Sequence, residues 1–177
     1  MRRKVQIPVD EKQKLLLEEI QQDIQQQFPN ALISAELPYN FPTFIIDHRF
    51  IKDVLKYLKE SPKWNFFFLT DLTGIQTPDE QHLGVIYHLH NLITNHRIRV
   101  KTFFSIDKPE VPTVTDLWKT SNWMERETYD FFGIIFKGHP DLRRILNPDE
   151  MDIFPLRKEF PVEDQTREDK DDTMFGR

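Results

Sequence analysis

The stretch "GVIYHLHNLITNHRIRVKTFFS", residues 84–105, decides the fold of this chain. It consists of two apolar runs that meet at Thr94 and Asn95, a pattern typical of two strands joined as a hairpin. In the second run three cations alternate with three residues suited to a core: Arg97, Arg99 and Lys101 with Ile98, Val100 and Thr102. Because alternate side chains of a strand point to opposite faces, we expect a sheet with one wet, basic face and one face packed under helices.

Two amphipathic helices are predicted on the N-terminal side of this hairpin. Residues 10–28 place five apolar side chains at helical spacing, with Asp10 as an N-cap and Pro29 as a stop: Leu16, Leu17, Ile20, Ile24 and Phe28. Residues 48–61, "HRFIKDVLKYLKES", predict a second helix with four inward side chains: Ile51, Val54, Leu55 and Leu58. Each helix has one apolar face to bury, and the sheet offers a surface for it.

Further strands are predicted around these helices. Residues 31–37, "ALISAEL", and residues 41–47, "FPTFIID", indicate short strands near Pro38 and Pro42. Residues 64–74, "WNFFFLTDLTG", predict a central strand that is buried on both faces and ends at Gly74. We therefore expect an α+β fold, in which an antiparallel or mixed sheet packs against helices.

The composition excludes several classes of protein. The 177 residues contain no cysteine, which removes disulfides, thiolate zinc sites and cysteine-ligated iron–sulfur clusters. The five glycines allow neither a dinucleotide-binding fingerprint nor a phosphate-binding loop, and the net charge of -5 argues against a nucleic-acid binder. No apolar run is long enough to span a membrane and no transit peptide is evident, so we expect a bacterial protein that does not itself cross a membrane.

The character of the sequence changes at Asn147. Between Asp149 and Arg177 there are ten acidic and five basic residues, together with two of the three prolines at 148, 155 and 161. Such a segment cannot bury enough apolar surface to fold alone. We expect a domain at residues 1–146, followed by an extended, partner-wrapping tail at residues 147–177.

The histidines and the basic strand offer weak alternatives. His88 and His90 share one face of a strand and could in principle bind a metal, but no acidic or cysteine ligand nearby completes a set. The other three histidines before the signature, His48, His82 and His96, stand alone. The cations of residues 97–101 could contact phosphates, although a solvated face or a protein contact suits the acidic chain better.

Residues 122–132 predict a helix with a mixed surface. Four residues form its packed stripe: Met124, Thr128, Phe131 and Phe132. Glu127 lies beside them next to Trp123, so we expect it to be at least half buried and paired with Arg143 or Arg144. Arg126 and Asp130 are spaced to pair with each other along the helix. Gly133 should end the helix in a left-handed conformation, before a short strand at residues 134–136 and a polar turn at residues 137–144.

Two interpretations of this polar segment remain open. An active site would need a general acid and base, for which Glu127 and His139 are the pair on offer, as in a stand-alone hydrolase. Alternatively, the polar residues order a surface that another protein contacts.

Residues 111–146, "VPTVTDLWKTSNWMERETYDFFGIIFKGHPDLRRIL", closely resemble the signature region of the 30 kDa subunit family of respiratory complex I. The residues that carry the signature, or match its continuation, are Glu125, Arg126, Glu127, Asp130, Gly133, Gly138, His139, Pro140, Asp141, Arg143, Arg144, Pro155, Arg157 and Lys158. The chain departs from the family pattern after residue 150, where Phe154 precedes Pro155 and Glu159 stands in place of aspartate.

The resemblance implies a non-catalytic structural subunit in the peripheral arm of a proton-translocating NADH:quinone oxidoreductase. Its signature residues would form or order an interface with the 49 kDa subunit (NuoD), next to the quinone-reducing module and the iron–sulfur subunits NuoB and NuoI. FMN, iron–sulfur clusters and quinone would belong to these partner subunits, and the chain would lie peripherally on the cytoplasmic face of the inner membrane. An equivalent subunit of a membrane-bound hydrogenase or a ferredoxin-driven complex is the alternative within the same class.

Overall fold

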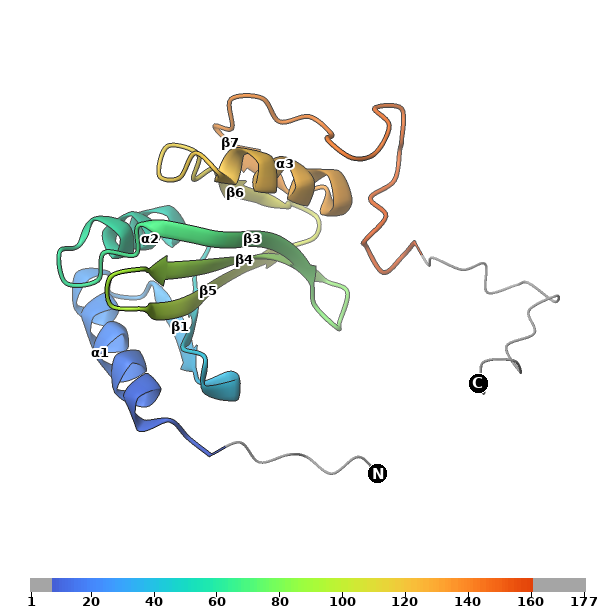
Figure 1. Ribbon diagram of the computed structural model, residues 1–177. Coiled ribbons are helices and arrows are strands. Elements are labelled where there is room, and N and C mark those ends of the chain that lie inside the picture. The colour runs from blue at the N-terminus through green and yellow to red at the C-terminus, as the bar shows by residue number, and fades with distance from the viewer. Residues whose placement is uncertain (1–7, 161–177) are drawn as a thin grey trace, which may run out of the picture.

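The structure is a computed structural model that describes residues 8–160 (Figure 1). Its helices are α1 (Glu11–Gln27), α2 (Ile51–Glu60) and α3 (Ser121–Phe132), with a short 3-10 helix at Pro38–Asn40. Its strands are β1 (Leu32–Glu36), β2 (Thr43–Ile46), β3 (Phe68–Gln76), β4 (His82–Asn91), β5 (His96–Ser105), β6 (Glu110–Pro112) and β7 (Ile135–Lys137). The predicted helices and strands are present in the predicted order, and β6 and the 3-10 helix, which were not predicted, are added to them. Within residues 8–160, no helix has the length and apolar character required to cross a membrane.

The larger sheet is mixed. Its five strands have the order β1-β2-β5-β4-β3. β4 and β5 form the predicted hairpin, in which Asn91 lies opposite His96. β2 and β5 are parallel, whereas the other neighbouring strands are antiparallel. The expected α+β class is therefore confirmed, and a small parallel pair of β6 and β7 is added to it.

One face of the larger sheet carries the core. On β4 and β5 the buried side chains alternate along each strand: Leu83, Val85, Tyr87 and Leu89 on the first, and Ile98, Val100 and Phe104 on the second. They belong to one apolar cluster with the buried residues of all three helices. The opposite face carries Arg97, Arg99 and Lys101, which are exposed or half-exposed. The alternation in the sequence correctly predicted these two faces.

The two N-terminal helices agree closely with the predictions from the sequence. The side chain of Asp10 accepts a hydrogen bond from the Lys12 amide and caps α1, as expected. All four residues predicted to point inward from α2 are fully buried. The carboxylate of Asp23 in α1 accepts hydrogen bonds from the Tyr57 hydroxyl, at 2.6 Å, and from the Trp64 indole. This polar contact joins α1 to α2 and to the chain that leads into β3.

The prediction for β3 was wrong in two respects. β3 is an edge strand of the sheet, and its buried side chains Leu69 and Leu72 are separated by exposed residues. The strand also continues through Gly74 to Gln76. A Cβ atom at residue 74 would lie 2.5 Å from Cδ2 of Phe132, so the glycine allows α3 to approach the strand. An apolar run cannot reveal whether a strand has one neighbour or two.

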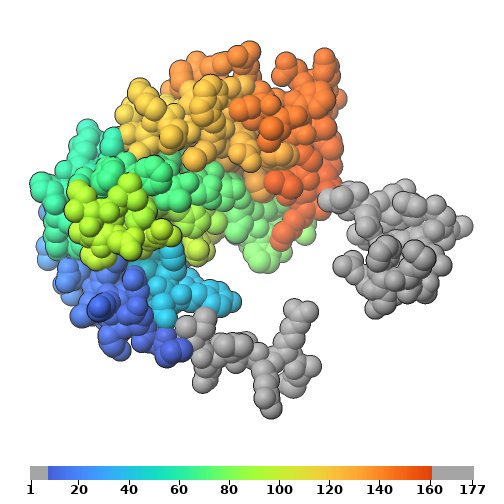
Figure 2. Space-filling model, viewed as in Figure 1, coloured from blue at the N-terminus to red at the C-terminus, as the bar shows by residue number. Residues whose placement is uncertain are grey.

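The chain after β7 returns across α3. Residues 138–160 contain no helix or strand, and we call them the 138–160 segment. The amide of Leu156 donates to the Phe131 carbonyl at 3.2 Å, and the amide of Lys158 donates to Gln76 Oε1 at 2.7 Å. Figure 2 shows this segment in orange, packed over the gold surface of α3. The proposed boundary after residue 146 stays a prediction, and residues 161–177 of the expected tail lie outside the described residues.

Candidate functional site: the third helix and the 138–160 segment

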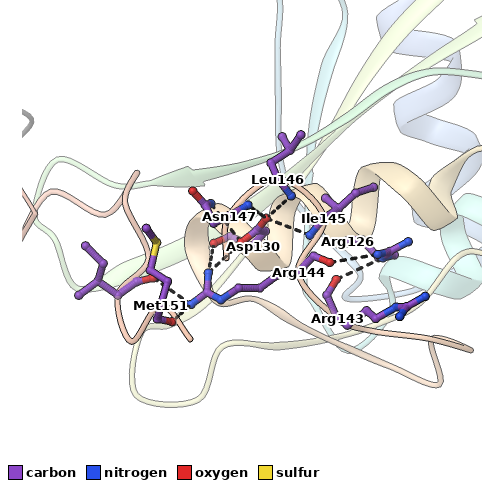
Figure 3. Close-up of polar contacts among 9 residues, drawn as sticks. Arg126, Asp130, Arg143, Arg144, Ile145, Leu146, Asn147 and Met151 are labelled. Atoms are coloured by element: carbon purple, nitrogen blue, oxygen red, sulfur yellow. Dashed lines mark hydrogen bonds and ion pairs between the residues drawn. The ribbon is translucent and has the colours of Figure 1, made fainter. Parts of the chain in front are cut away.

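Asp130, in the last turn of α3, is a fully buried carboxylate surrounded by donors (Figure 3). Its Oδ2 atom accepts hydrogen bonds from the backbone amides of Ile145 (3.0 Å), Leu146 (2.7 Å) and Asn147 (2.9 Å). Its Oδ1 atom accepts one from the Arg144 guanidinium at 2.8 Å and one from the side-chain amide of Asn147 at 3.1 Å. One helical side chain therefore fixes the backbone of the 138–160 segment.

The electrostatics of Asp130 favour its charged form. Burial by itself raises the pKa of a carboxyl group, because desolvation disfavours the charge. The Asn147 amide, the Arg144 guanidinium and the two other amides outweigh burial and hold the pKa of Asp130 well below its ordinary value. Asp130 and Arg144 thus form a buried ion pair with side-chain exposures of 0% and 8%.

Arg144 uses its remaining donors on the same segment. Its Nη1 atom donates to the Asp130 carbonyl at 2.9 Å, in addition to the carboxylate. Its Nη2 atom donates to the carbonyls of Met151 and Ile153, the latter at 3.0 Å. These contacts join two stretches of irregular backbone to the end of α3. The side chains of the ion pair thus satisfy backbone groups that have no partner in a helix or a sheet.

Arg157 and Gly133 make a second attachment at the end of α3. The Arg157 Nε atom donates to the Phe132 carbonyl at 2.7 Å. The guanidinium groups of Arg144 and Arg157 lie 5.1 and 4.7 Å from the ring centre of Phe154, within cation–π range. Gly133 has the predicted left-handed backbone, with φ of 70°, and a Cβ atom there would come within 2.6 Å of the Phe154 ring. Both the backbone and the packing require glycine at this position.

The expected pair of Arg126 and Asp130 does not form. Arg126 is buried, and its Nε and Nη2 atoms donate to the carbonyls of Arg143 (3.2 Å) and Arg144 (3.0 Å). Its guanidinium also lies 5.6 Å from the ring centre of Trp123. The prediction was wrong because the returning segment supplies both residues with partners that a local helical pair cannot match.

The expectation for Glu127 was also wrong. Glu127 is exposed, and Trp123, which was expected to help bury it, is itself 60% exposed. The acidic residue that enters the core is Glu125. Its position could have been found, because Glu125, Thr128 and Phe132 follow the i, i+3, i+7 spacing of one helical face.

Glu125 is a fully buried carboxyl group with few partners. Its Oε1 atom accepts from the Val114 amide at 2.8 Å, and its Oε2 atom accepts from the Thr113 hydroxyl at 2.5 Å. Burial outweighs these hydrogen bonds and raises the pKa of Glu125 to about 7. The fully buried hydroxyl of Tyr87 has no hydrogen-bond partner within residues 8–160, and burial followed by the charge of Glu125 raises the pKa of Tyr87 well above its ordinary value.

His139 stabilises the polar turn at the start of the 138–160 segment. Its Nδ1 atom accepts from the Asp141 amide at 3.0 Å, so its Nε2 atom carries the proton and donates to the Asn122 carbonyl at 3.1 Å. Gly138, with φ of 84°, supplies the left-handed backbone before it. Both nitrogens of the ring are engaged and Glu127 is exposed, so this geometry gives the hydrolase hypothesis no support.

The remaining signature residues lie at the surface or close to it. Pro140, Asp141, Arg143 and Lys158 are exposed, and Pro155 is half-buried. Asp141 and Arg143 form an exposed ion pair of 3.0 Å with each other. Four apolar side chains of the segment also face solvent: Ile145, Leu146, Ile153 and Leu156. The 138–160 segment thus has an ordered polar underside and an outer surface that carries both charged and apolar side chains.

The histidine pair on β4 is occupied by local contacts. The Nε2 atom of His88 accepts from Arg99 Nε at 2.9 Å, and its Nδ1 atom lies 3.5 Å from Asp71 Oδ2. Burial, the charge of Arg99 and that of Lys101 lower the pKa of His88 against the influence of Asp71. His90 contacts the side chain of Asn95 at 3.0 Å. Within residues 8–160, no group of three or more metal-binding side chains comes together.

Comparisons with known proteins agree with the signature. Residues 44–166 match the family described as "Respiratory-chain NADH dehydrogenase, 30 Kd subunit". The chain is 36% identical over 143 residues to a protein of Chlorobium phaeobacteroides that is named as a subunit of NADH-quinone oxidoreductase, across 80% of this chain and 86% of that protein.

Solved structures show the same fold. A chain of the membrane-bound sulfane sulfur reductase, an archaeal respiratory membrane complex, superposes with a TM-score of 0.69 and 31% identity, over 82% of this chain and 85% of that chain. A trypsin-resistant fragment of Nqo5 superposes with a TM-score of 0.60 and 29% identity, over 73% of this chain and 98% of the fragment. The chain therefore belongs to the family of the 30 kDa subunit of respiratory-chain NADH dehydrogenase, complex I.

Proposed function

We propose that this chain is a positional, non-catalytic subunit of the peripheral arm of an NADH:quinone oxidoreductase. Its 138–160 segment docks on the 49 kDa subunit, NuoD, beside the quinone-reducing module. NuoB, NuoI and the other partner subunits hold the flavin, the iron–sulfur clusters and the quinone, and they keep the chain at the cytoplasmic face of a bacterial inner membrane. Family membership supports the assembly, and the lack of cysteine in the sequence supports the absence of clusters from this chain.

One observation carries the docking proposal. The buried Asp130–Arg144 pair orders a segment that has neither helix nor strand, and the segment presents Leu146 and Leu156 to solvent. Burying an ion pair is costly unless its surroundings compensate for lost hydration, so such a pair is weak evidence for stability alone. A pre-ordered surface lowers the entropy cost of binding, which gives the network a purpose in assembly.

The test replaces exposed apolar residues of the segment without disturbing its underside. Leu146→Asp with Leu156→Asp should leave the thermal melt of the isolated chain unchanged and lower the amount of assembled peripheral arm on native gels. The NADH:quinone activity per flavin should stay normal in the copies that assemble. Leu15→Asp, which changes an equally exposed leucine on α1, is the matched control and should assemble normally. Normal assembly with lost activity would show that the segment takes part in quinone reduction.

A second candidate follows from the archaeal structural relative, whose complex is described as a sulfane sulfur reductase. The same fold thus occurs in a respiratory complex with a different name. This agrees with the alternative that the chain belongs to a hydrogenase or a ferredoxin-driven complex. Purification through a tag on this chain distinguishes the two. Recovery of a flavin-containing, NADH-oxidising subunit supports the NADH-linked complex, and its absence from an intact complex supports the alternative.

A further inference from the structure

We propose a second interaction surface, at the end of the sheet away from the 138–160 segment, which binds a partner-subunit segment that combines carboxylates with an apolar side chain. It consists of the β4–β5 turn (residues 92–95) and of residues 67 and 68, where β3 begins, and we call it the hairpin-tip patch. The 138–160 segment meets β3 at its other end, near Gln76. Figure 1 shows the β4–β5 turn and the 138–160 segment on opposite sides of the molecule. The proposal rests on the proposed function in one respect, namely that this chain works inside an assembly.

The hairpin-tip patch exposes four large apolar side chains. Ile93 is 79% exposed and Leu92 is 52% exposed, at the turn itself. Phe67 and Phe68 are also exposed, and the register places Phe68 opposite His90, two residues before Leu92. Single exposed apolar residues are common, but a group of this kind marks an interaction site.

The turn is held rigidly by a buried asparagine. Asn91 is 3% exposed, and its side-chain oxygen accepts hydrogen bonds from the amides of Ile93 (2.9 Å) and Thr94 (3.2 Å). Its side-chain nitrogen donates to the Trp64 carbonyl at 2.7 Å, which fixes the turn against the body of the protein. A turn that is ordered in advance loses little entropy when its exposed tip binds, so Ile93 is well placed as an anchor.

The surroundings of the patch select an acidic partner. Neither residues 61–70 nor residues 81–106 contain an aspartate or glutamate, although the whole chain has a net charge of -5. Lys63 and Arg97 border the patch, and within residues 8–160 neither has a carboxylate within 4.0 Å. The Lys63 ammonium lies 4.3 Å from the ring centre of Trp64, within cation–π range.

Charge also argues against two other occupants. A second copy of this chain in a two-fold arrangement would bring the same cations against themselves, which is unfavourable. Recognition of an anionic membrane typically uses about four to eight lysine or arginine residues, and this patch has two at its border. Apolar anchors with a sparse cationic rim fit a protein surface of opposite charge.

The absence of cysteine from the chain allows a direct test with single-cysteine probes. The Ile93→Cys chain is labelled with a maleimide both in isolation and in the complex, which is purified from cells that contain no wild-type copy of this chain. The labelled peptide is quantified by mass spectrometry. Assembly should slow labelling about tenfold or more, as expected for a side chain at the centre of an interface. Leu15→Cys on α1 is the control for general accessibility and should react at equal rates.

Charge reversal tests the nature of the partner. Adding Lys63→Glu and Arg97→Glu to the Ile93→Cys chain should bring the labelling rate in the complex back towards that of the isolated chain. Slow labelling that survives the reversal would exclude an acidic partner. Concentration-dependent protection of the isolated chain would indicate a second copy, and protection by phosphatidylglycerol vesicles would indicate a membrane; either result overturns the proposal.

Leu146→Cys separates this inference from the proposed function. If the complex protects residue 146 but leaves residue 93 as reactive as in the isolated chain, the hairpin-tip patch is not an interface and the proposed function stands. If it protects residue 93 and leaves residue 146 reactive, the docking role of the 138–160 segment fails and the hairpin-tip patch stands.

Discussion

Replacing Asp130 by asparagine should release the 138–160 segment from α3. The substitution keeps the shape of the side chain but removes the charge that five hydrogen bonds now satisfy. If the asparagine oxygen serves the three backbone amides, its NH2 group faces the donors of Arg144 and Asn147. Because one member of a buried ion pair is lost, the cost should be about 3 to 5 kcal/mol.

Amide hydrogen exchange measures this cost where it arises. At about 1.4 kcal/mol for each factor of ten, the amides of residues 145–147 should exchange roughly a hundredfold to a few thousandfold faster. The amides of α1 should be unaffected and serve as an internal reference. Asp141→Asn is the matched control, because Asp141 is exposed and, within residues 8–160, its side chain hydrogen-bonds only to Arg143. Unchanged exchange at residues 145–147 in Asp130→Asn would refute the claim that this carboxylate orders the segment.

Three further predictions concern α3 and β3. The pKa of Glu125 is raised in the folded chain from 4.5 to about 7, so the contribution of Glu125 to stability should be fully present below pH 4.5 and be lost as the pH rises through 7, by about 3 kcal/mol in all; denaturant titrations above pH 4.5 should show this slope in the wild type and lose it in Glu125→Gln. Gly74→Ala should destabilise the chain by about 1 to 3 kcal/mol, because its Cβ atom would press on the Phe132 ring, whereas Thr73→Ala, on the exposed side of β3, should have little effect on the denaturation midpoint. Glu127→Gln should change stability by less than about 0.5 kcal/mol, since the side chain is exposed. A clear drop in the melting temperature of this variant would show that Glu127 is buried and paired after all.

Periodicity predicted the parts of the fold that depend on local patterns. The alternation of residues 97–102 correctly assigned the two faces of β5, and helical spacing correctly assigned the buried residues of α1 and α2. The edge position of β3 escaped prediction because strand order depends on which strands pair. The aromatic run at residues 66–68 suggested burial on both faces, although Phe67 and Phe68 are exposed.

The candidate site shows the same division. The motif selected the stretch from Glu125 to Lys158, whose role as an interface stays a prediction, and it did not reveal which of its residues are buried or which pair with each other. Glu127 was expected to be buried because Trp123 lies beside it, yet both face solvent, and Glu125 meets Thr113 and Val114 instead. A helical wheel gives the angle between side chains; it does not say which angle faces the core.

The sequence by itself determined the family, the α+β class, the hairpin and the left-handed glycine at residue 133, because each of these depends on the spacing of residues along a continuous stretch of chain. Only the tertiary structure decided that Asp130 pairs with Arg144 and not with Arg126, and that Glu125 is held without a cation. The physical reason is that a buried charge is governed by desolvation and by whichever donors surround it. Those donors come from segments that fold back from a distance, which no local pattern records.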